Sequence, residues 1–257
     1  MIPYNTITAW GVTHPWITRE QIEQDLLISK AIIDIYSNEM LSDELIFRGG
    51  TALHKLIMPY PIRYSEDLDF VRTNAGGIGD IIDALRDIGE KSGYTVKVKL
   101  EKYPKIFWHC KAQTERTIKI KIEINTFERT PALPLADTSH SVHTNWFSGN
   151  AMVKMFQSEE MAATKLRALY QRTKGRDLLD LWLMTNEVGI DPDLVCHAFL
   201  TYRPEGFSAK KAIHNLEKKL TDSLFLTDID NLISYRLENY NVEIAAKQVI
   251  DLYLTRL

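Results

Sequence analysis

The segment FRGGTALHKL, followed closely by RYSEDLDF, constrains the fold of this chain more than any other feature. A short apolar run, residues 44–48, ends at two glycines, and residues 51–57 are typical of a brief helix. Residues 65–73 then alternate as a strand, which places Asp67 and Asp69 on the same face. The sequence therefore predicts a strand, a glycine turn, a short helix and a second strand that returns alongside the first.

The glycine turn has the composition of a phosphate-binding loop. Gly49 and Gly50 would let the backbone approach an anion closely, and a helix start presents free N–H groups. Thr51 would either cap this helix or donate its hydroxyl to a phosphate. An ordinary turn between a strand and a helix has the same composition, so the motif alone does not decide between the two. No G-x-x-x-x-G-K-[ST] pattern is present, which disfavours a P-loop enzyme.

The two aspartates favour a metal site. Carboxylates at positions i and i+2 of a strand repel each other unless a divalent cation lies between them. The alternative is a surface strand that carries two exposed acids. Glu123 lies on the polar face of a later strand, residues 117–127, and three carboxylates on neighbouring strands can hold two Mg²⁺ ions. We therefore predict Asp67, Asp69 and Glu123 as metal ligands, with Mg²⁺ as cofactor and an NTP as substrate.

Composition indicates an ordinary globular protein. The 257 residues are 45% hydrophobic and 25% charged, and no run approaches the roughly 20 apolar residues of a membrane span. The first ten residues lack the basic and apolar regions of a secretory signal. Cys110 and Cys196 form no C-x-x-C motif, so we expect a reduced, cytoplasmic protein without a membrane partner.

The charge is unevenly distributed. Residues 91–129 contain ten Lys or Arg against four Glu, a net +6, which leaves the rest of the chain at −9 and the whole at −3. A basic segment on an acidic body is compatible with a polyanion site for nucleotide or nucleic acid. The alternative is that these lysines are the solvated faces of edge strands.

The order of predicted elements indicates an α+β half followed by a helical half. Residues 94–103 and 117–127 alternate as strands with one buried and one polar face, and residues 130–146 have the composition of a loop. We place one domain at 1–150 and a helical domain at 151–257. Helices are expected at 18–38, 78–91, 158–174, 176–189, 192–200, 208–220 and 241–257.

Charged residues in the helical half form a second group. Lys165 and Arg172 are seven residues apart, so on one helix they would share a face and reach one triphosphate. Asp177 and Asp180 are three apart and would also share a face. The alternative for these aspartates is a structural pairing with Arg176 and the nearby lysines.

Taken together, the ordered motifs G-G-T-A-L, R-x-S-x-D-x-D-F, K-I-E-I and K-L-R-A-L-Y-x-R-x-K-x-R-D-x-x-D-L resemble the AbiEii/AbiGii toxin family of nucleotidyltransferases. The match runs from Phe47 to Trp182. The resemblance implies a polymerase-β-like nucleotidyltransferase fold, a mixed sheet flanked by helices with a helical carboxy-terminal domain. It further implies a toxin of a bacterial toxin–antitoxin or abortive-infection system, with an antitoxin protein or transcriptional regulator as partner.

The resemblance also implies roles for individual residues. The expected catalytic residues are Asp67, Asp69, Glu123, Lys165 and Asp180. The expected nucleotide contacts are Gly49, Gly50, Thr51, Arg63, Ser65, Lys165, Arg172 and Asp177. The wider superfamily has Gly-Ser where this chain has Gly49-Gly50, so Thr51 is the substitute hydroxyl.

The expected reaction is transfer of a nucleoside monophosphate from an NTP to a hydroxyl, with release of pyrophosphate. The 3′ end of tRNA is the favoured acceptor, because the basic strands between Lys97 and Lys121 suit RNA. Three alternatives remain: nucleotidylation of a protein side chain, a nucleotide-binding or partner-binding protein without catalysis, and a metal-dependent phosphodiesterase. A structural zinc site is disfavoured, because the cysteines and histidines lack the required spacing.

Overall fold

The computed structural model describes residues 1–235, 237 and 239–257, and it divides into two compact units. Unit 1 comprises Met1–Leu56, Tyr60–Thr130 and Leu135–Phe156. Unit 2 comprises Ile57–Pro59, Pro131–Pro134 and Gln157–Leu257. The chain passes from unit 1 into the largest segment of unit 2 after Phe156, directly after the last strand of the sheet.

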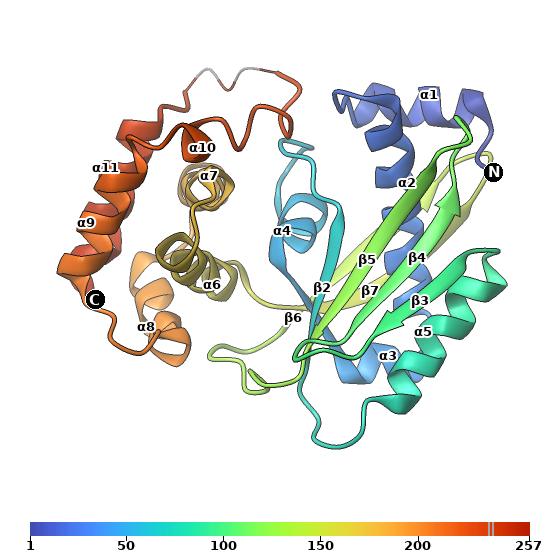
Figure 1. Ribbon diagram of the computed structural model, residues 1–257, viewed down its shortest axis with the longest axis horizontal. Helices are drawn as coiled ribbons and strands as arrows, with labels where there is room; N and C mark the ends of the chain where they lie inside the picture. Colours follow the sequence, from blue (N-terminus) through green and yellow to red (C-terminus); the bar gives the residue numbers. More distant parts are fainter. Residues whose placement is uncertain (236, 238) are drawn as a thin grey trace. The chain divides into compact units, whose positions relative to one another are not determined.

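Unit 1 is built on a seven-stranded mixed sheet with the order β3-β4-β5-β2-β1-β7-β6 (Figure 1). Its strands are β1 (Leu45–Arg48), β2 (Asp67–Arg72), β3 (Thr95–Lys99), β4 (Lys105–Lys111), β5 (Thr117–Asn125), β6 (Ala136–His143) and β7 (Ser148–Met155). Strand β2 is antiparallel to β1 and parallel to β5, and β7 is parallel to β1. The remaining pairs, β3–β4, β4–β5 and β6–β7, are antiparallel. The prediction that the aspartate strand lies alongside the first strand is confirmed.

The helices of unit 1 flank this sheet on both faces. They are α1 (Tyr4–Thr13), α2 (Arg19–Tyr36), α3 (Glu39–Glu44), α4 (Gly49–Ala52), a π-helical turn (Leu53–Ile57, its last residue in unit 2) and α5 (Gly79–Lys91). Helix α2 packs against β5, β6 and β7, and α5 packs against β3 and β4 (Figure 1). The predicted capping box of α2 is present, because Thr18 and Gln21 each accept a hydrogen bond from the other's backbone N–H.

Apolar and polar residues alternate along β4 and β5, which gives the sheet a buried apolar face and a polar face. Ile106, Trp108 and Cys110 of β4 are buried, with Ile118, Ile120 and Ile122 of β5 beside them. On β1 and β2, Phe47 and Phe70 are register partners whose rings stack with centroids 5.1 Å apart. The intervening residues of β3, β4 and β5 point to the other face, where the polar side chains gather.

Three strands depart from the sequence prediction. Strand β4 was not predicted, although its buried residues alternate. The predicted loop at 130–146 is wrong over much of its length, because residues 136–143 form β6, which pairs with the equally unpredicted β7. Strand β6 contains small polar residues, and only Val142 is buried, so the apolar alternation that marks a strand is missing.

Unit 2 is helical among its described residues. Its elements are α6 (Ser158–Gln171), α7 (Gly175–Leu183), a π-helical turn (Met184–Val188), α8 (Pro192–Tyr202), α9 (Ala209–Lys219), α10 (Ser223–Leu226), α11 (Val242–Leu252) and a 3₁₀ turn (Leu254–Arg256). Helix α6 packs against α7, α8 and α9. Within the part of the chain that the structure describes, no helix combines the length and apolar character needed to span a membrane.

Candidate functional site

The glycine turn after β1 lies directly against three side chains, one from β2 and two from the segment that leads into it. Gly49 has a φ of +84°, and a Cβ there would lie 2.7 Å from Oδ2 of Asp69. A Cβ on Gly50 would lie 2.6 Å from Nη2 of Arg63 and 2.9 Å from Oγ of Ser65. Both positions therefore require glycine, the first for its conformation and both for the close approach.

Thr51 lies in the interior of unit 1. The residue is 1% exposed, and its hydroxyl donates a hydrogen bond to the main-chain oxygen of Asp67 at 2.5 Å. The same hydroxyl lies 3.0 Å from Oγ of Ser65. Helix α4 already begins at Gly49, so Thr51 does not open the helix as we expected. In this structure Thr51 fixes the glycine turn to the start of β2.

A row of four charged residues crosses the sheet at this turn. Asp69 on β2 is the register partner of Glu123 on the parallel strand β5. On the outer sides of this pair, Arg48 of β1 is opposite Asp69 and Lys105 of β4 is opposite Glu123. Register partners project their side chains to the same face, so the row contains two carboxylates flanked by two cations.

Lys121 neutralises part of the carboxylate charge. It is the register partner of Asp67, its Nζ lies 2.8 Å from Oδ2 of that residue, and it lies 3.6 Å from Oε2 of Glu123. Burial opposes the charge of the Lys121 ammonium. The hydrogen bond to Asp67 and the charges of Asp69 and Glu123 outweigh burial and raise the pKa of Lys121.

Asp69 has the least favourable position for a negative charge. Burial raises its pKa above the usual range, and the charge of Asp67 raises it further. Lys121 and Arg48 oppose this shift without cancelling it. The ionised form of a carboxyl group in this position is stabilised more by an added positive charge than that of an exposed carboxyl group.

The donor chemistry of the site suits a divalent cation. Asp67, Asp69 and Glu123 supply the carboxylate oxygens that Mg²⁺ prefers, and burial together with the charge of Asp67 raises the pKa of Asp69. Among the residues that the structure describes, however, no three Asp, Glu, His or Cys side chains are gathered as a metal-binding group. The Lys121 ammonium provides the compensating charge in the arrangement observed here.

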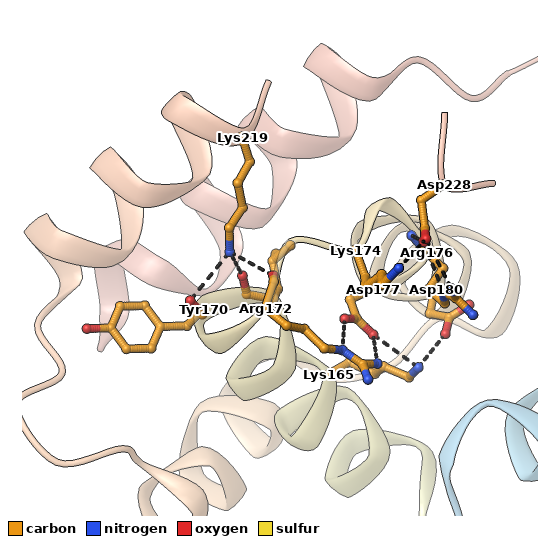
Figure 2. A network of polar contacts seen from close by, with 10 residues as sticks. Lys165, Tyr170, Arg172, Lys174, Arg176, Asp177, Asp180, Lys219 and Asp228 are labelled. Atoms are coloured by element: carbon orange, nitrogen blue, oxygen red, sulfur yellow. Dashed lines mark hydrogen bonds and ion pairs between the residues drawn. The ribbon is translucent and has the colours of Figure 1, made fainter. Parts of the chain in front are cut away.

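A second charged cluster is built entirely within unit 2 (Figure 2). Lys165 of α6 is 7% exposed, and its Nζ lies 2.6 Å from Oδ2 of Asp180 and 3.3 Å from Oδ1 of Asp177. Both aspartates belong to α7 and are fully buried. Arg172 binds the Asp177 carboxylate with both arms of its guanidinium, at 2.7 and 2.8 Å. Asp177 and Asp180 thus share a face, as predicted.

The prediction that Lys165 and Arg172 share a helix face is wrong. Helix α6 ends at Gln171, and Arg172 is extended, with φ −135° and ψ 158°. The two cations meet on Asp177 instead. Lys219 of α9 holds the end of α6 by donating to the main-chain oxygens of Leu169, Tyr170 and Arg172, the last at 2.9 Å (Figure 2).

Arg176 belongs to a separate part of this network. Its guanidinium binds both carboxylate oxygens of Asp228, at 2.9 and 3.0 Å, and Lys174 lies 3.2 Å from the same residue. Burial opposes the charge on Asp228, but the hydrogen bonds from Arg176 outweigh it and lower the pKa of Asp228. The structural alternative is confirmed for a nearby lysine, because Lys165 pairs with both Asp177 and Asp180, whereas Arg176 forms its bidentate ion pair with Asp228.

A family model described as nucleotidyl transferase AbiEii toxin of a type IV toxin–antitoxin system matches residues 32–238. The chain belongs to the AbiEii family. The resemblance drawn from the motifs is confirmed, and the chain is a nucleotidyltransferase toxin of a type IV toxin–antitoxin system. None of the curated proteins gives a significant match.

One solved structure agrees with the AbiEii assignment at the level of the fold. The chain is similar to MenT4, a nucleotidyltransferase toxin from Mycobacterium tuberculosis H37Rv, with a TM-score of 0.65 and 16% identity over 100% of this chain and 91% of that one. An antigenic nucleotidyltransferase-like protein from Paracoccidioides brasiliensis matches with a TM-score of 0.45 and 17% identity, over 85% of this chain and 97% of that one. The predicted α+β nucleotidyltransferase fold, a mixed sheet flanked by helices, is confirmed.

Several residues of this AbiEii-family site were not named individually from the sequence. Arg48 and Lys121 complete the charge pattern around Asp69, and both have a signal in the sequence, because they lie one and two residues from predicted site residues. Lys219 and Asp228 have no such signal, since each contacts residues about 50 positions away.

Proposed function

We propose that this AbiEii-family enzyme transfers a nucleoside monophosphate from an NTP to a hydroxyl of RNA, with the 3′ end of tRNA as the acceptor. Unit 1 would be the nucleotidyltransferase domain, and unit 2 the helical carboxy-terminal domain. The observation that carries the proposal is the in-register pair Asp69 and Glu123, beside Asp67 and under the glycine turn. The use of NTP and tRNA favours a cytoplasmic enzyme.

Asp67, Asp69 and Glu123 would hold Mg²⁺. When bound, Mg²⁺ lowers the pKa of a coordinated hydroxyl and neutralises the charge that develops on the leaving pyrophosphate. Asp69 contributes a carboxylate whose charge is poorly compensated without the ion. Lys121 bridges toward Asp67 and Glu123, so it would hold these side chains in place before substrate and metal arrive.

The glycine turn would bind the triphosphate. Without side chains at Gly49 and Gly50, phosphate oxygens can approach the backbone N–H groups, and the Ser65 hydroxyl and Arg63 lie directly against this turn. Arg63 is 2% exposed, and its Nη1 donates to the main-chain oxygen of Tyr64 at 2.9 Å, which helps to orient the guanidinium. We assign Thr51 to fixing the turn, since its buried hydroxyl is already engaged by Asp67.

The residues of unit 2 would contribute a nucleotide contact through Lys165. Asp177 and Asp180 hold its ammonium in place through ion pairs, and Arg172 shares Asp177 with it. In this assignment Lys165 and Arg172 contact the nucleotide, whereas Asp177 and Asp180 are positioning residues. Loss of NTP binding in Lys165→Gln, with the melting temperature monitored in parallel, tests this assignment.

The reaction is tested by incubating the purified protein with total tRNA, Mg²⁺ and each α-³²P-labelled NTP in turn. Asp69→Asn is the inactive variant, and Asp83→Asn, an exposed carboxylate on α5, is the matched control. We expect label on tRNA with one NTP in the wild type and the control, and none in Asp69→Asn. Label on protein would favour protein nucleotidylation. Absence of label with intact NTP binding would favour a non-catalytic binding protein.

Membership of a type IV toxin–antitoxin family implies an antitoxin partner. We propose that the antitoxin suppresses the toxicity that results from this transfer. Expression of the wild type should arrest growth, and expression of Asp69→Asn should not. Co-expression of the antitoxin should restore growth, and arrest by Asp69→Asn as strong as that by the wild type would contradict a catalytic cause.

A further inference from the structure

The polar face of the sheet extends beyond the carboxylates onto β3, β4 and β5. Register partners and alternate residues along each strand share this face. Its positions on these three strands include Thr95, Lys97, Lys99, Lys105, Phe107, His109, Lys119 and Lys121. We call this group the β3–β5 basic face. Helices α2 and α5 pack against the opposite, apolar side of these strands, so the basic face is not needed to build the core.

Phe107 is the apolar residue at the centre of this face. Lys97 of β3 and Lys121 of β5 are its register partners on either side. The Nζ atoms of Lys99 and Lys119 lie 5.8 and 5.7 Å from the centroid of its ring. The ring is only partly buried, whereas the neighbouring Trp108 on the opposite face is fully buried. A partly exposed aromatic ring is thus surrounded by four lysines.

Carboxylates compensate only part of this positive charge. Lys105 pairs with Glu101 at 2.8 Å, and Lys121 pairs with Asp67. In the described residues, Lys97, Lys99 and Lys119 have no carboxylate within ion-pair distance. The central part of the face therefore presents an aromatic ring with three uncompensated cations around it.

This combination suits an unpaired nucleic acid strand. A base stacks on a partly exposed aromatic ring, and lysines on either side bind the phosphates that precede and follow it. Neighbouring strands lie about 4.8 Å apart, so Phe107 on β4 is roughly 10 Å from the aspartates on β2. A short stretch of RNA can therefore contact Phe107 while its end reaches the carboxylates.

We propose that the β3–β5 basic face binds the unpaired end of the acceptor RNA, with a base stacked on Phe107 and phosphates held by Lys97, Lys99 and Lys119. The proposal rests on the proposed function and adds the surface that selects the acceptor. It commits to single-stranded RNA, and a protein such as the antitoxin is the alternative occupant that the experiment separates.

The test is fluorescence anisotropy with a short, unstructured, fluorescein-labelled RNA in the absence of NTP. Phe107→Ala should weaken binding roughly tenfold or more, because a stack on one base is lost, and Phe107→Trp should restore it. Lys99→Gln and Lys119→Gln should each weaken binding and reduce the salt dependence by about 0.7 in the slope of log K against log salt. Lys91→Gln, at the end of α5, is the control that should change neither quantity.

Two readouts separate failure of this inference from failure of the proposed function. In the labelling reaction, Phe107→Ala should raise the KM for RNA and leave the KM for NTP unchanged. If Phe107→Ala binds and uses RNA like the wild type while label transfer proceeds, the inference is overturned and the proposed function remains. If RNA receives no label but binding still depends on Phe107, the inference remains and the transfer reaction is wrong. Loss of antitoxin binding by Phe107→Ala, with RNA binding intact, would overturn the inference in favour of a protein-docking face.

Discussion

Asp69 and Glu123 lie side by side in register on the parallel strands β2 and β5, with Arg48 beside the first and Lys105 beside the second. The pairing places two carboxylates at the spacing of neighbouring strands, on the face of the sheet where the glycine turn contacts Asp69. Lys121 and Arg48 offset only part of the burial and repulsion that raise the pKa of Asp69, so ionised Asp69 costs folding free energy while no divalent cation is bound. This cost can be measured in variants of Asp69.

Replacement of Asp69 by Asn should separate activity from stability. The variant should lose transfer activity by roughly a thousandfold or more, because a metal-binding carboxylate is removed. In buffer with EDTA its melting temperature should equal or exceed that of the wild type, because a partly buried charge repelled by Asp67 is also removed. Mg²⁺ should raise the melting temperature of the wild type more than that of Asp69→Asn. A variant that melts well below the wild type in EDTA would contradict this account of Asp69.

The same pair of proteins should differ in pH dependence. The pKa of Asp69 is raised from 3.8, so the folded protein retains this proton to a higher pH than the unfolded chain does. The contribution of Asp69 to stability therefore falls as the pH rises above about 3.8. The difference in unfolding free energy between Asp69→Asn and the wild type should be smallest near the acidic end and should grow toward neutral pH. Urea titrations in EDTA at several pH values measure it, and a difference that shrinks with rising pH would contradict the raised pKa.

Replacement of Gly49 by Ala tests the contact between the turn and Asp69. Gly49 and Gly93 have similar φ values, +84° and +78°, but a Cβ on Gly93 meets no atom within 4 Å. Gly93→Ala should therefore cost about 1 kcal/mol through backbone strain alone. Gly49→Ala should cost roughly 1–3 kcal/mol more because the Cβ crowds Oδ2 of Asp69, and it should lose most transfer activity. Equal losses of stability in the two variants, measured by urea denaturation, would show that the close approach is unimportant.

The sequence predicted the arrangement of these residues in the sheet well because the information for it is local. Alternation placed Asp67 and Asp69 on one face, and the short glycine turn and helix could only return the chain beside β1. Glu123 was predictable from the clean alternation of β5. The alternation alone does not give the register that makes it the partner of Asp69, because a shift of two residues would preserve the same faces.

The parts that were not predicted depend on distant contacts or on weak patterns. The β6–β7 hairpin contains few apolar residues, so its pairing with the rest of the sheet is not visible in the local sequence. Arg172 shows the same limitation, because its helical spacing from Lys165 was misleading once α6 ended at Gln171. The end of α6 is held by Lys219, which is about 50 residues away. Nothing in the spacing of the charged residues indicates such a contact.

Replacement of Thr51 separates a structural role from a phosphate contact. Thr51→Val keeps the shape but removes the hydroxyl that donates to the main-chain oxygen of Asp67, and Thr51→Ser keeps the hydroxyl. We expect Thr51→Val to lose about 1–2 kcal/mol of unfolding free energy and Thr51→Ser to lose less. NTP affinity, measured by calorimetry under conditions where both variants are folded, should change little. A large loss of NTP affinity in Thr51→Val at unchanged stability would instead make Thr51 a phosphate ligand.

Removal of the Lys165 ammonium should lower the free energy of unfolding, because it leaves the two buried carboxylates of unit 2 with less compensating charge. In Lys165→Met the ammonium shared by Asp177 and Asp180 is lost, and the free energy of unfolding should fall by about 3 kcal/mol at neutral pH. The double variant Lys165→Met/Asp180→Asn should recover part of the loss, since it leaves one buried charge fewer.

Lys174→Met is the control, because its side chain is 47% exposed and Asp228 keeps Arg176 as partner, so a loss within about 1 kcal/mol is expected. Urea denaturation of the four proteins decides the matter, and a double variant no more stable than Lys165→Met would show that Lys165 stabilises unit 2 by packing rather than by charge.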